Sequence, residues 1–150
     1  MPDRTQDRGA DRRHEFAAAV IMDARDRLLL LRRSPSCRRW PGKWGLAGGG
    51  LEAGETPEQG LRRELLEELG SDIRLRRIAG PDKLVAVGPY VGFIHLDHCL
   101  WLGGVIRLSP EHTGYLWTDP DQYAALEVMP GIDEDLAHFG IWPGHGRKGS

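Results

Sequence analysis

The order of the expected secondary structure predicts an α+β fold, in which a mixed β-sheet is sandwiched between helices as α/β/α layers. Two observations carry this prediction. Strand-like apolar runs come first, one well-marked helix follows over residues 57–69, and further strand-like runs precede two short helical segments. The chain also has 150 residues, which suits one domain with a sizeable core.

Both ends of the chain are expected to lie outside that domain. Residues 1–13 are rich in Asp and Arg and have no apolar periodicity, which is typical of a flexible arm. Residues 143–150 form a polar, Gly-rich tail. The predicted domain therefore spans residues 14–142.

The first half of the domain begins with two β-type runs, residues 16–22 and 27–32, and the polar turn between them predicts a hairpin. A basic, Pro-containing loop follows over residues 34–43. Residues 44–47 then lead into three glycines at 48–50, which allow a backbone to approach a ligand closely.

The helix over residues 57–69 has clear signals at both ends. Thr56 can cap the first turn, Pro57 suits the first helical position, and Gln59 completes a Thr-x-x-Gln capping box. Gly70 is typical of the residue that ends a helix.

Two faces of this helix differ in chemistry. Leu61, Leu65 and Leu69 share a stripe that should face a core, and Glu64, Glu67 and Glu68 share an adjacent arc. Like charges at i,i+4 and acids in the last turn each cost a few tenths of a kcal/mol. A divalent cation would reverse these terms, and carboxylates without His or Cys suit Mg²⁺, with Mn²⁺ as the alternative, rather than zinc. A solvated charged face is the competing interpretation.

The second half returns to strands and ends in helices. Strand-like runs are expected over residues 73–78, 85–92, 93–108 and 115–117, and helices over residues 121–126 and 132–139. We expect Trp44 and Trp101 to lie in the core.

One stretch of the chain carries a spaced set of charged residues and glycines. Gly49 is followed after five residues by Glu55, and after seven more by the run Arg63-Glu64-Leu65-Leu66-Glu67-Glu68-Leu69-Gly70. This pattern resembles the signature of the Nudix hydrolases, with MutT-type members favoured. Ser71 and Ala47 depart from the residues usual at their positions. The resemblance implies the α/β/α Nudix fold and hydrolysis of a nucleoside diphosphate linked to a group X.

The resemblance also implies roles for individual residues. The metal ligands would be the backbone carbonyl of Gly48 and the carboxylates of Glu64, Glu67 and Glu68. Arg63 would pair with Glu55 or Glu67, and Arg63 and Glu55 would organise the loop and the helix. Glu64 is the favoured general base. Glu111 lies in a segment similar to the EH…W stretch of nucleotide-hydrolysing members and is the alternative base, unless it is a surface carboxylate.

Four further residues are candidates for substrate contacts, namely Arg33, Trp40, Tyr90 and Trp117. An arginine near the end of the second strand contacts phosphate in MutT-type members, which suggests Arg33, although a solvated strand end is an equal alternative. The three aromatic residues could stack on a base, or could instead belong to the core. His95 and His98 should face opposite sides of a strand, which disfavours a metal site there.

The favoured reaction is the conversion of a (d)NTP into an NMP and pyrophosphate with Mg²⁺. The alternative substrates are conjugates, namely a dinucleoside polyphosphate, ADP-ribose or a nucleotide sugar. A non-catalytic nucleotide-binding Nudix module is less favoured, because such modules usually lose glutamates of the signature and this chain retains them.

Composition narrows the partners and the compartment. A net charge of −2 and no apolar run near 18 residues predict a small-molecule nucleotide partner rather than a nucleic-acid polymer or a membrane. Cys37 and Cys99 are too few for a disulfide framework, and the N-terminal segment lacks a secretory apolar run, so a cytoplasmic protein is expected. The protein is expected to act as a monomer or homodimer.

Overall fold

The computed structural model describes residues 14–86 and 92–142. The predicted arm (1–13), the predicted tail (143–150) and Tyr90 lie outside the described residues, so the predicted domain boundaries stay a prediction. Within the described residues, none of the helices is long and apolar enough to span a membrane.

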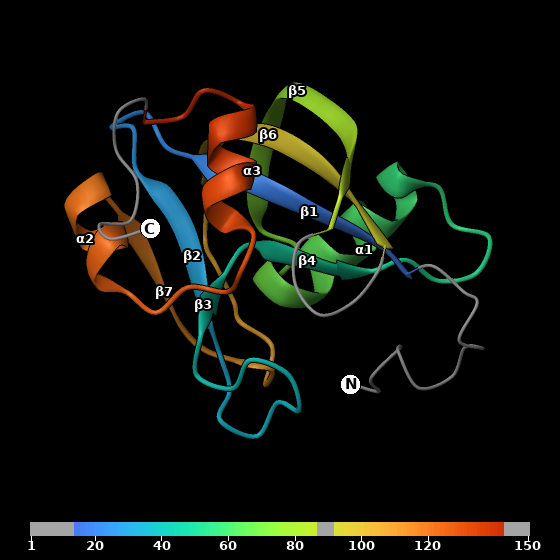
Figure 1. The fold of residues 1–150 in the computed structure, drawn as a ribbon, viewed down its shortest axis with the longest axis horizontal. Coiled ribbons are helices and arrows are strands. Elements are labelled where there is room, and N and C mark those ends of the chain that lie inside the picture. The colour runs from blue at the N-terminus through green and yellow to red at the C-terminus, as the bar shows by residue number, and fades with distance from the viewer. Residues whose placement is uncertain (1–13, 87–91, 143–150) are drawn as a thin grey trace.

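Strands and helices follow the predicted order (Figure 1). The strands are β1 (His14–Met22), β2 (Leu28–Arg33), β3 (Trp44–Gly45), β4 (Ala47–Gly50), β5 (Ile73–Val85), β6 (Gly92–Gly104) and β7 (His112–Thr118). The helices are α1 (Pro57–Leu69), α2 (Pro120–Ala125) and α3 (Ile132–His138).

The sheet is mixed, as predicted. Its strand order is β3-β2-β1-β6-β5, with β4 paired to β1 and β7 paired to β2. β1 and β6 run parallel, from the pair His14↔Gly92 to the pair Met22↔Leu100, and the other paired strands are antiparallel. This pairing places β1 at the centre of the sheet, with β4 beside it.

The expected hairpin between the first two strands is formed only at its turn. The N–H of Asp26 donates to the carbonyl of Asp23 at 3.0 Å, but β1 and β2 share one register pair, Met22↔Leu28. β1 pairs along its length with β6, and β2 pairs with β7. The predicted hairpin is therefore confirmed, since β1 and β2 are antiparallel neighbours in the sheet, but its ladder is short because each strand pairs mainly with another partner.

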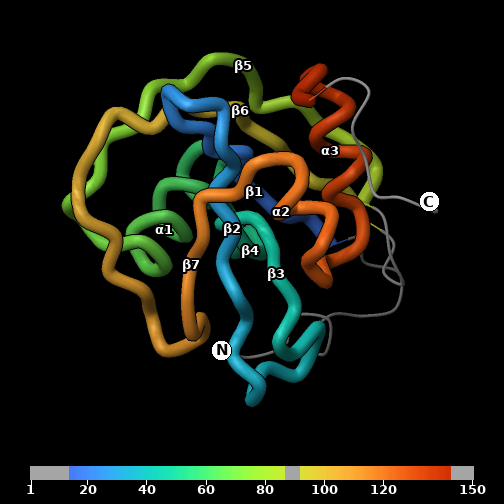
Figure 2. Tube along the Cα trace, turned by 90° about the vertical axis from the view of Figure 1, so that its left-hand side faces the viewer, coloured from blue at the N-terminus to red at the C-terminus, as the bar shows by residue number. Residues whose placement is uncertain are grey.

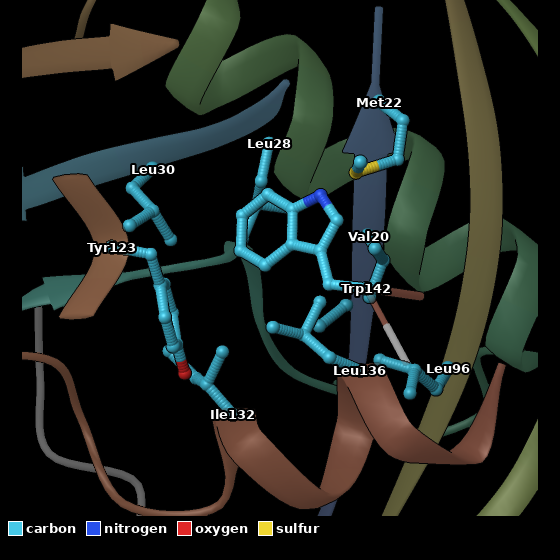
Figure 3. Packing of buried hydrophobic residues seen from close by; sticks show 10 residues of the cluster. Val20, Met22, Leu28, Leu30, Leu96, Tyr123, Ile132, Leu136 and Trp142 are labelled. Carbon is cyan, nitrogen blue, oxygen red and sulfur yellow. The ribbon is translucent and has the colours of Figure 1, made fainter. Parts of the chain in front are cut away.

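Each face of β1 is buried by a different helical layer, which confirms the α/β/α arrangement. A core on the α1 side takes Ala17, Ala19 and Ile21 from β1, and a core on the α3 side takes Ala18, Val20 and Met22. Figure 2 shows α1 and α3 on opposite sides of β1, β2 and β4. On the α3 side, Ile132, Leu136 and Trp142 pack against the strands (Figure 3).

Helix α1 follows its sequence signals closely. Thr56 and Gln59 form the predicted reciprocal capping box, and Gly70 follows the last turn with a φ of 89°. Leu61 and Leu69 are buried in the α1-side core, which confirms the leucine stripe. The helix is therefore fixed by packing on one face, and its glutamates are held at defined positions.

Three predicted boundaries in the second half were wrong. β5 is one strand over Ile73–Val85, with register shifts between Arg77 and Asp82, and so extends past the expected end at residue 78. β6 ends at Gly104 rather than at residue 108, where Gly103 and Gly104 adopt φ values of 135° and 120°. β7 begins at His112, before the expected residue 115.

Candidate active site

A cavity of about 470 Å³ lies beside the glycine strand β4. Its walls come from β1, β4, the basic loop after β2, the start of β7 and α3. Residues that line it include Gly48, Gly49, Gly50, Glu68, Arg33, Arg38, Arg39, Trp40, Glu111, His112, Met129, Ile132 and Asp135. Five of the predicted site residues, namely Gly48, Glu68, Glu111, Arg33 and Trp40, therefore lie around one space.

Arg63 holds the loop and the helix together beside this cavity. Its Nε donates to Glu55 Oε2 at 2.7 Å, its Nη1 to Glu64 Oε2 at 2.8 Å, and its Nη2 to the Gly50 carbonyl at 3.0 Å. The hydrogen bond to Glu55 is the largest cause that raises the pKa of Arg63. The expected pairing with Glu55 is confirmed, and Glu67 lies 3.5 Å away as a second ion-pair partner.

Glu64 and Glu68 are buried carboxylates, with 1% and 5% of their surface exposed. Glu68 Oε1 accepts the N–H of Gly48 at 2.9 Å. Burial raises the pKa of both side chains, and for Glu68 the nearby Glu64 charge adds to the shift. A Cβ built on Gly49 would lie 2.6 Å from the Glu64 carboxyl carbon, so a side chain there would displace this carboxylate.

The oxygen donors beside the cavity suit a divalent cation. The Glu64 charge raises the pKa of the buried Glu68 carboxyl, and among the described residues Arg63 hydrogen-bonds Glu64 and not Glu68, so an ionised Glu68 needs a further positive charge nearby. Glu67 is 55% exposed, and within the described residues no three His, Cys, Asp or Glu side chains converge as a ready ligand set. The residues beside the cavity therefore fit a divalent cation by the chemistry and charge of their oxygen atoms, with Glu68 as the central ligand.

The basic loop and the start of β7 supply the other wall of the cavity. Arg33 Nε donates to the Arg39 carbonyl at 2.8 Å, which fixes the side chain along the loop. The Glu111 charge raises the pKa of Glu68, so the two carboxyls act on each other across the cavity. Burial, aided by the Arg33 charge and opposed by the Glu111 charge, lowers the pKa of His112 to about 4. His112 is therefore a neutral imidazole at neutral pH.

The structure does not bring every predicted residue to the cavity. Trp117 is partly buried against the α1-side core and lies edge-on to Trp101 with ring centroids 5.3 Å apart, outside the residues that line the cavity. Trp101 occupies the core as expected, and Trp44 packs against the α3-side core. Tyr90 lies outside the described residues, so its predicted stacking role is not placed.

His95 and His98 take opposite faces of β6, as predicted. His95 Nε2 lies 2.6 Å from Glu15 Oε1, and the ring of His98 lies 5.4 Å from that of Phe139, measured between centroids. Neither ring lines the cavity.

Comparison with known proteins places the chain in a family. The family model of the NUDIX domain matches residues 12–139. The chain is a Nudix hydrolase. A MutT-like protein of Streptomyces ambofaciens is 37% identical over 123 residues, covering 77% of this chain and 75% of that protein. The nucleoside triphosphatase NudI of Salmonella paratyphi B is 31% identical over 117 residues, covering 68% of this chain and 79% of that protein.

A solved Nudix-family structure agrees with this assignment. The crystal structure of the MutT protein from Methanosarcina mazei superposes with a TM-score of 0.67 at 25% identity, covering 87% of this chain and 95% of that one. This Nudix hydrolase is thus an enzyme of the pyrophosphohydrolase class, and hydrolases of its family use divalent metal ions.

Two buried polar residues of the cavity were missed from the sequence. In helix α3, Asp135 lies three residues after Ile132 and one before Leu136, so helical periodicity alone puts it near the buried face. His112 gave no such signal, because its burial depends on the pairing of β7 with β2.

Proposed function

We propose that this Nudix hydrolase converts a (deoxy)nucleoside triphosphate into the monophosphate and pyrophosphate, with Mg²⁺ as the metal. The observation that carries the proposal is the cavity itself, which joins the carboxylates of Glu68 and Glu111 to a wall with Arg33, Arg38 and Arg39. Arginines favour phosphate oxygens because a guanidinium donates several hydrogen bonds and keeps its charge. The nucleoside triphosphatase activity named for the Salmonella relative supports the same substrate class.

The metal site is proposed around Glu68, Glu64, Glu67 and the Gly48 carbonyl. A bound divalent cation would neutralise the negative charge that develops on the phosphoryl oxygens. Arg63 has a positioning role, since its bonds to Glu55, Glu64 and Gly50 fix the glycine loop relative to α1. The arginines of the basic loop would hold the phosphates against this cluster.

The general base is proposed to be Glu111, with Glu64 as the alternative. Glu64 is 1% exposed, is bound to Arg63 at 2.8 Å and does not line the cavity. Glu111 does line it, and its charge acts on Glu68. A carboxylate on the cavity wall can accept a proton from an attacking water, whereas one enclosed by Arg63 is poorly placed to do so.

Replacing Glu111 tests this assignment. Glu111→Gln is expected to lower kcat by about a hundredfold or more, the usual contribution of a positioned base, with little change in the affinity for product nucleotide. The measurement is steady-state turnover beside equilibrium binding of a nucleoside monophosphate. Glu127→Gln removes an exposed carboxylate and serves as the control. Near wild-type turnover in Glu111→Gln would instead support Glu64 as the general base.

Metal binding should stabilise the folded protein. A ligand that binds only the native state adds RT ln(1 + [L]/Kd), which is roughly 2.7 kcal/mol at about a hundred times Kd. Thermal unfolding in Mg²⁺, against Na⁺ at matched ionic strength, should show a rise of several degrees. EDTA should abolish turnover, and Mg²⁺ or Mn²⁺ should restore it. Equal melting temperatures in both salts would argue for a solvated acidic face.

Product analysis tests the substrate class. Chromatography of reactions with the four dNTPs, ADP-ribose, a nucleotide sugar and a dinucleoside tetraphosphate reports the preferred substrate and the bond that is cleaved. The proposal expects a monophosphate and pyrophosphate from at least one dNTP, at the highest kcat/KM of the panel. Preference for a conjugate would replace the triphosphate assignment. We further propose that the protein is cytoplasmic and acts as a monomer or homodimer; the free thiols of Cys37 and Cys99 support a reducing compartment.

A further inference from the structure

The first residue of β7 is a buried histidine with an unsatisfied ring nitrogen. His112 is 8% exposed and lines the cavity together with Arg33 and Glu111. Its Nδ1 is buried and has no hydrogen-bond partner within the described residues. Such atoms are rare in folded proteins, because an unsatisfied buried polar group destabilises the fold. A histidine retained here at that cost indicates a role other than packing.

The segment that carries His112 is fixed to the basic loop. The N–H of Ser34 donates to the Glu111 carbonyl at 2.8 Å, and the Cys37 thiol lies 3.6 Å from the same oxygen as a second donor. The backbone N–H of His112 donates to the Ser109 carbonyl at 3.1 Å. These contacts hold the histidine at one position on the cavity wall.

The His112 ring is a neutral hydrogen-bonding group. Burial and the charge of Arg33, its partner in the β2–β7 register, lower its pKa to about 4. A neutral imidazole has one N–H donor and one acceptor nitrogen. Orphaned buried N–H groups are rarer than under-satisfied acceptors, which places the ring proton on Nε2 and leaves Nδ1 bare. Because Nδ1 is enclosed, the ring edge that can reach the cavity carries this N–H donor.

A donor at this place suits a phosphate oxygen. The arginines of the basic loop, Arg33, Arg38 and Arg39, line the same cavity, so an anionic group would find positive charge beside the histidine. Phosphate oxygens accept hydrogen bonds, and such charge-assisted bonds are stronger than those between neutral groups. Among the described residues, no acceptor for the Nε2–H of His112 is seen, so this donor remains for a ligand.

We propose that the Nε2–H of His112 donates a hydrogen bond to a phosphoryl oxygen of the substrate. This inference rests on the proposed placement of the phosphates against the basic loop. A neutral donor also suits the neighbouring Glu111, the proposed general base. A further positive charge beside Glu111 would lower the pKa of its carboxyl and make it a weaker base, whereas a neutral imidazole binds phosphate without this penalty.

The test is equilibrium binding of inorganic pyrophosphate to the full chain, by calorimetry with Mg²⁺ at neutral pH. Three substitutions separate the two ring nitrogens. In His112→Gln the amide nitrogen can take the place of Nε2, in His112→Asn it can only take that of Nδ1, and His112→Phe keeps a ring without nitrogen. His112→Gln should bind within about threefold of the wild type, and the other two about tenfold more weakly, the worth of one hydrogen bond to a charged group.

A matched control and a stability measurement separate binding from packing. His138→Gln replaces an exposed histidine that does not line the cavity and should keep the wild-type affinity for pyrophosphate. His112→Phe removes the unsatisfied nitrogen, so it should resist denaturant at least as well as the wild type while binding pyrophosphate more weakly. A loss of affinity that follows a loss of stability in all three His112 variants would instead indicate a packing role and overturn the proposal.

The wild-type protein provides a readout that needs no substitution. Nitrogen-15 NMR of the His112 ring should show the proton on Nε2, and pyrophosphate should shift the Nε2 resonance more than that of Nδ1. A proton on Nδ1, or wild-type affinity for pyrophosphate in both His112→Asn and His112→Phe, would overturn the proposal. So would a wild-type protein that does not bind pyrophosphate.

Binding of pyrophosphate requires no anhydride cleavage, so this result is separate from the hydrolysis panel. If pyrophosphate affinity depends on His112 but no dNTP is cleaved, the inference stands and the triphosphate proposal fails. If dNTPs are cleaved and pyrophosphate affinity does not depend on His112, the triphosphate proposal stands and the inference fails.

Discussion

Glu68→Gln is expected to lower turnover by at least about a hundredfold, the scale of losing one key electrostatic group in an active site. Glu68 lines the cavity and is 5% exposed, so its charge acts with little screening by water. Glutamine keeps the size and a carbonyl oxygen that can accept the Gly48 N–H. What changes is the negative charge that would bind the metal.

The same substitution should stabilise the metal-free protein. Burial and the Glu64 charge raise the pKa of Glu68, which means that the folded state disfavours its ionised form. Without metal, the melting temperature of Glu68→Gln should therefore equal or exceed that of the wild type at neutral pH. The rise caused by Mg²⁺ should shrink, because one ligand charge is lost.

A matched control separates charge from position. Glu58→Gln removes one negative charge from the same helix, at an exposed side chain paired with Arg77. It should keep wild-type turnover and the full Mg²⁺ effect, since exposed ion pairs contribute little. Near wild-type turnover in Glu68→Gln would show that the metal and catalytic assignment is wrong.

The helix of the site could be predicted because its signals are local. The capping box of Thr56 and Gln59, the stop at Gly70 and the stripe of Leu61 and Leu69 all lie within one short stretch, and each was found where expected. Local signals of this kind do not depend on the rest of the fold. The hydrogen bonds of Arg63 to Glu55 and Glu64 join residues of the same short stretch.

Features that depend on long-range pairing could not be predicted. Glu111 reaches the cavity because β7 pairs with β2 and not with its sequence neighbour β6, and Trp117 is turned against Trp101 by the same pairing. The basic loop supplies Arg33 and Trp40 to the cavity wall only once β2 and β3 are side by side. Sequence spacing gave these residues as candidates and could not say which of them share a cavity.

Asp135→Asn is expected to make the protein more stable at about pH 8, by roughly 2 to 4 kcal/mol. The folded-state pKa of Asp135 is about 7, raised by burial from an ordinary value of 3.8. For such a group, the free energy of unfolding is highest below the unfolded pKa, where the side chain is protonated in both states. It falls as pH rises towards the folded pKa, because the unfolded chain ionises freely whereas the folded protein must ionise a buried acid.

The stabilising effect of Asp135→Asn should therefore depend on pH. Near pH 4 the wild-type side chain is protonated in the folded protein, so the variant and the wild type should unfold at similar denaturant concentrations. Between about pH 4 and pH 7 the difference should grow, and it should level off above the folded pKa. Denaturant unfolding at several pH values measures this directly, with Asp121→Asn as the control for loss of an exposed acid.

A difference that stays constant with pH would mean that the Asp135 carboxyl is not desolvated in the folded protein. A stabilisation that appears only above about pH 4 would show that the buried Asp135 carboxyl is retained at a cost to the stability of the fold.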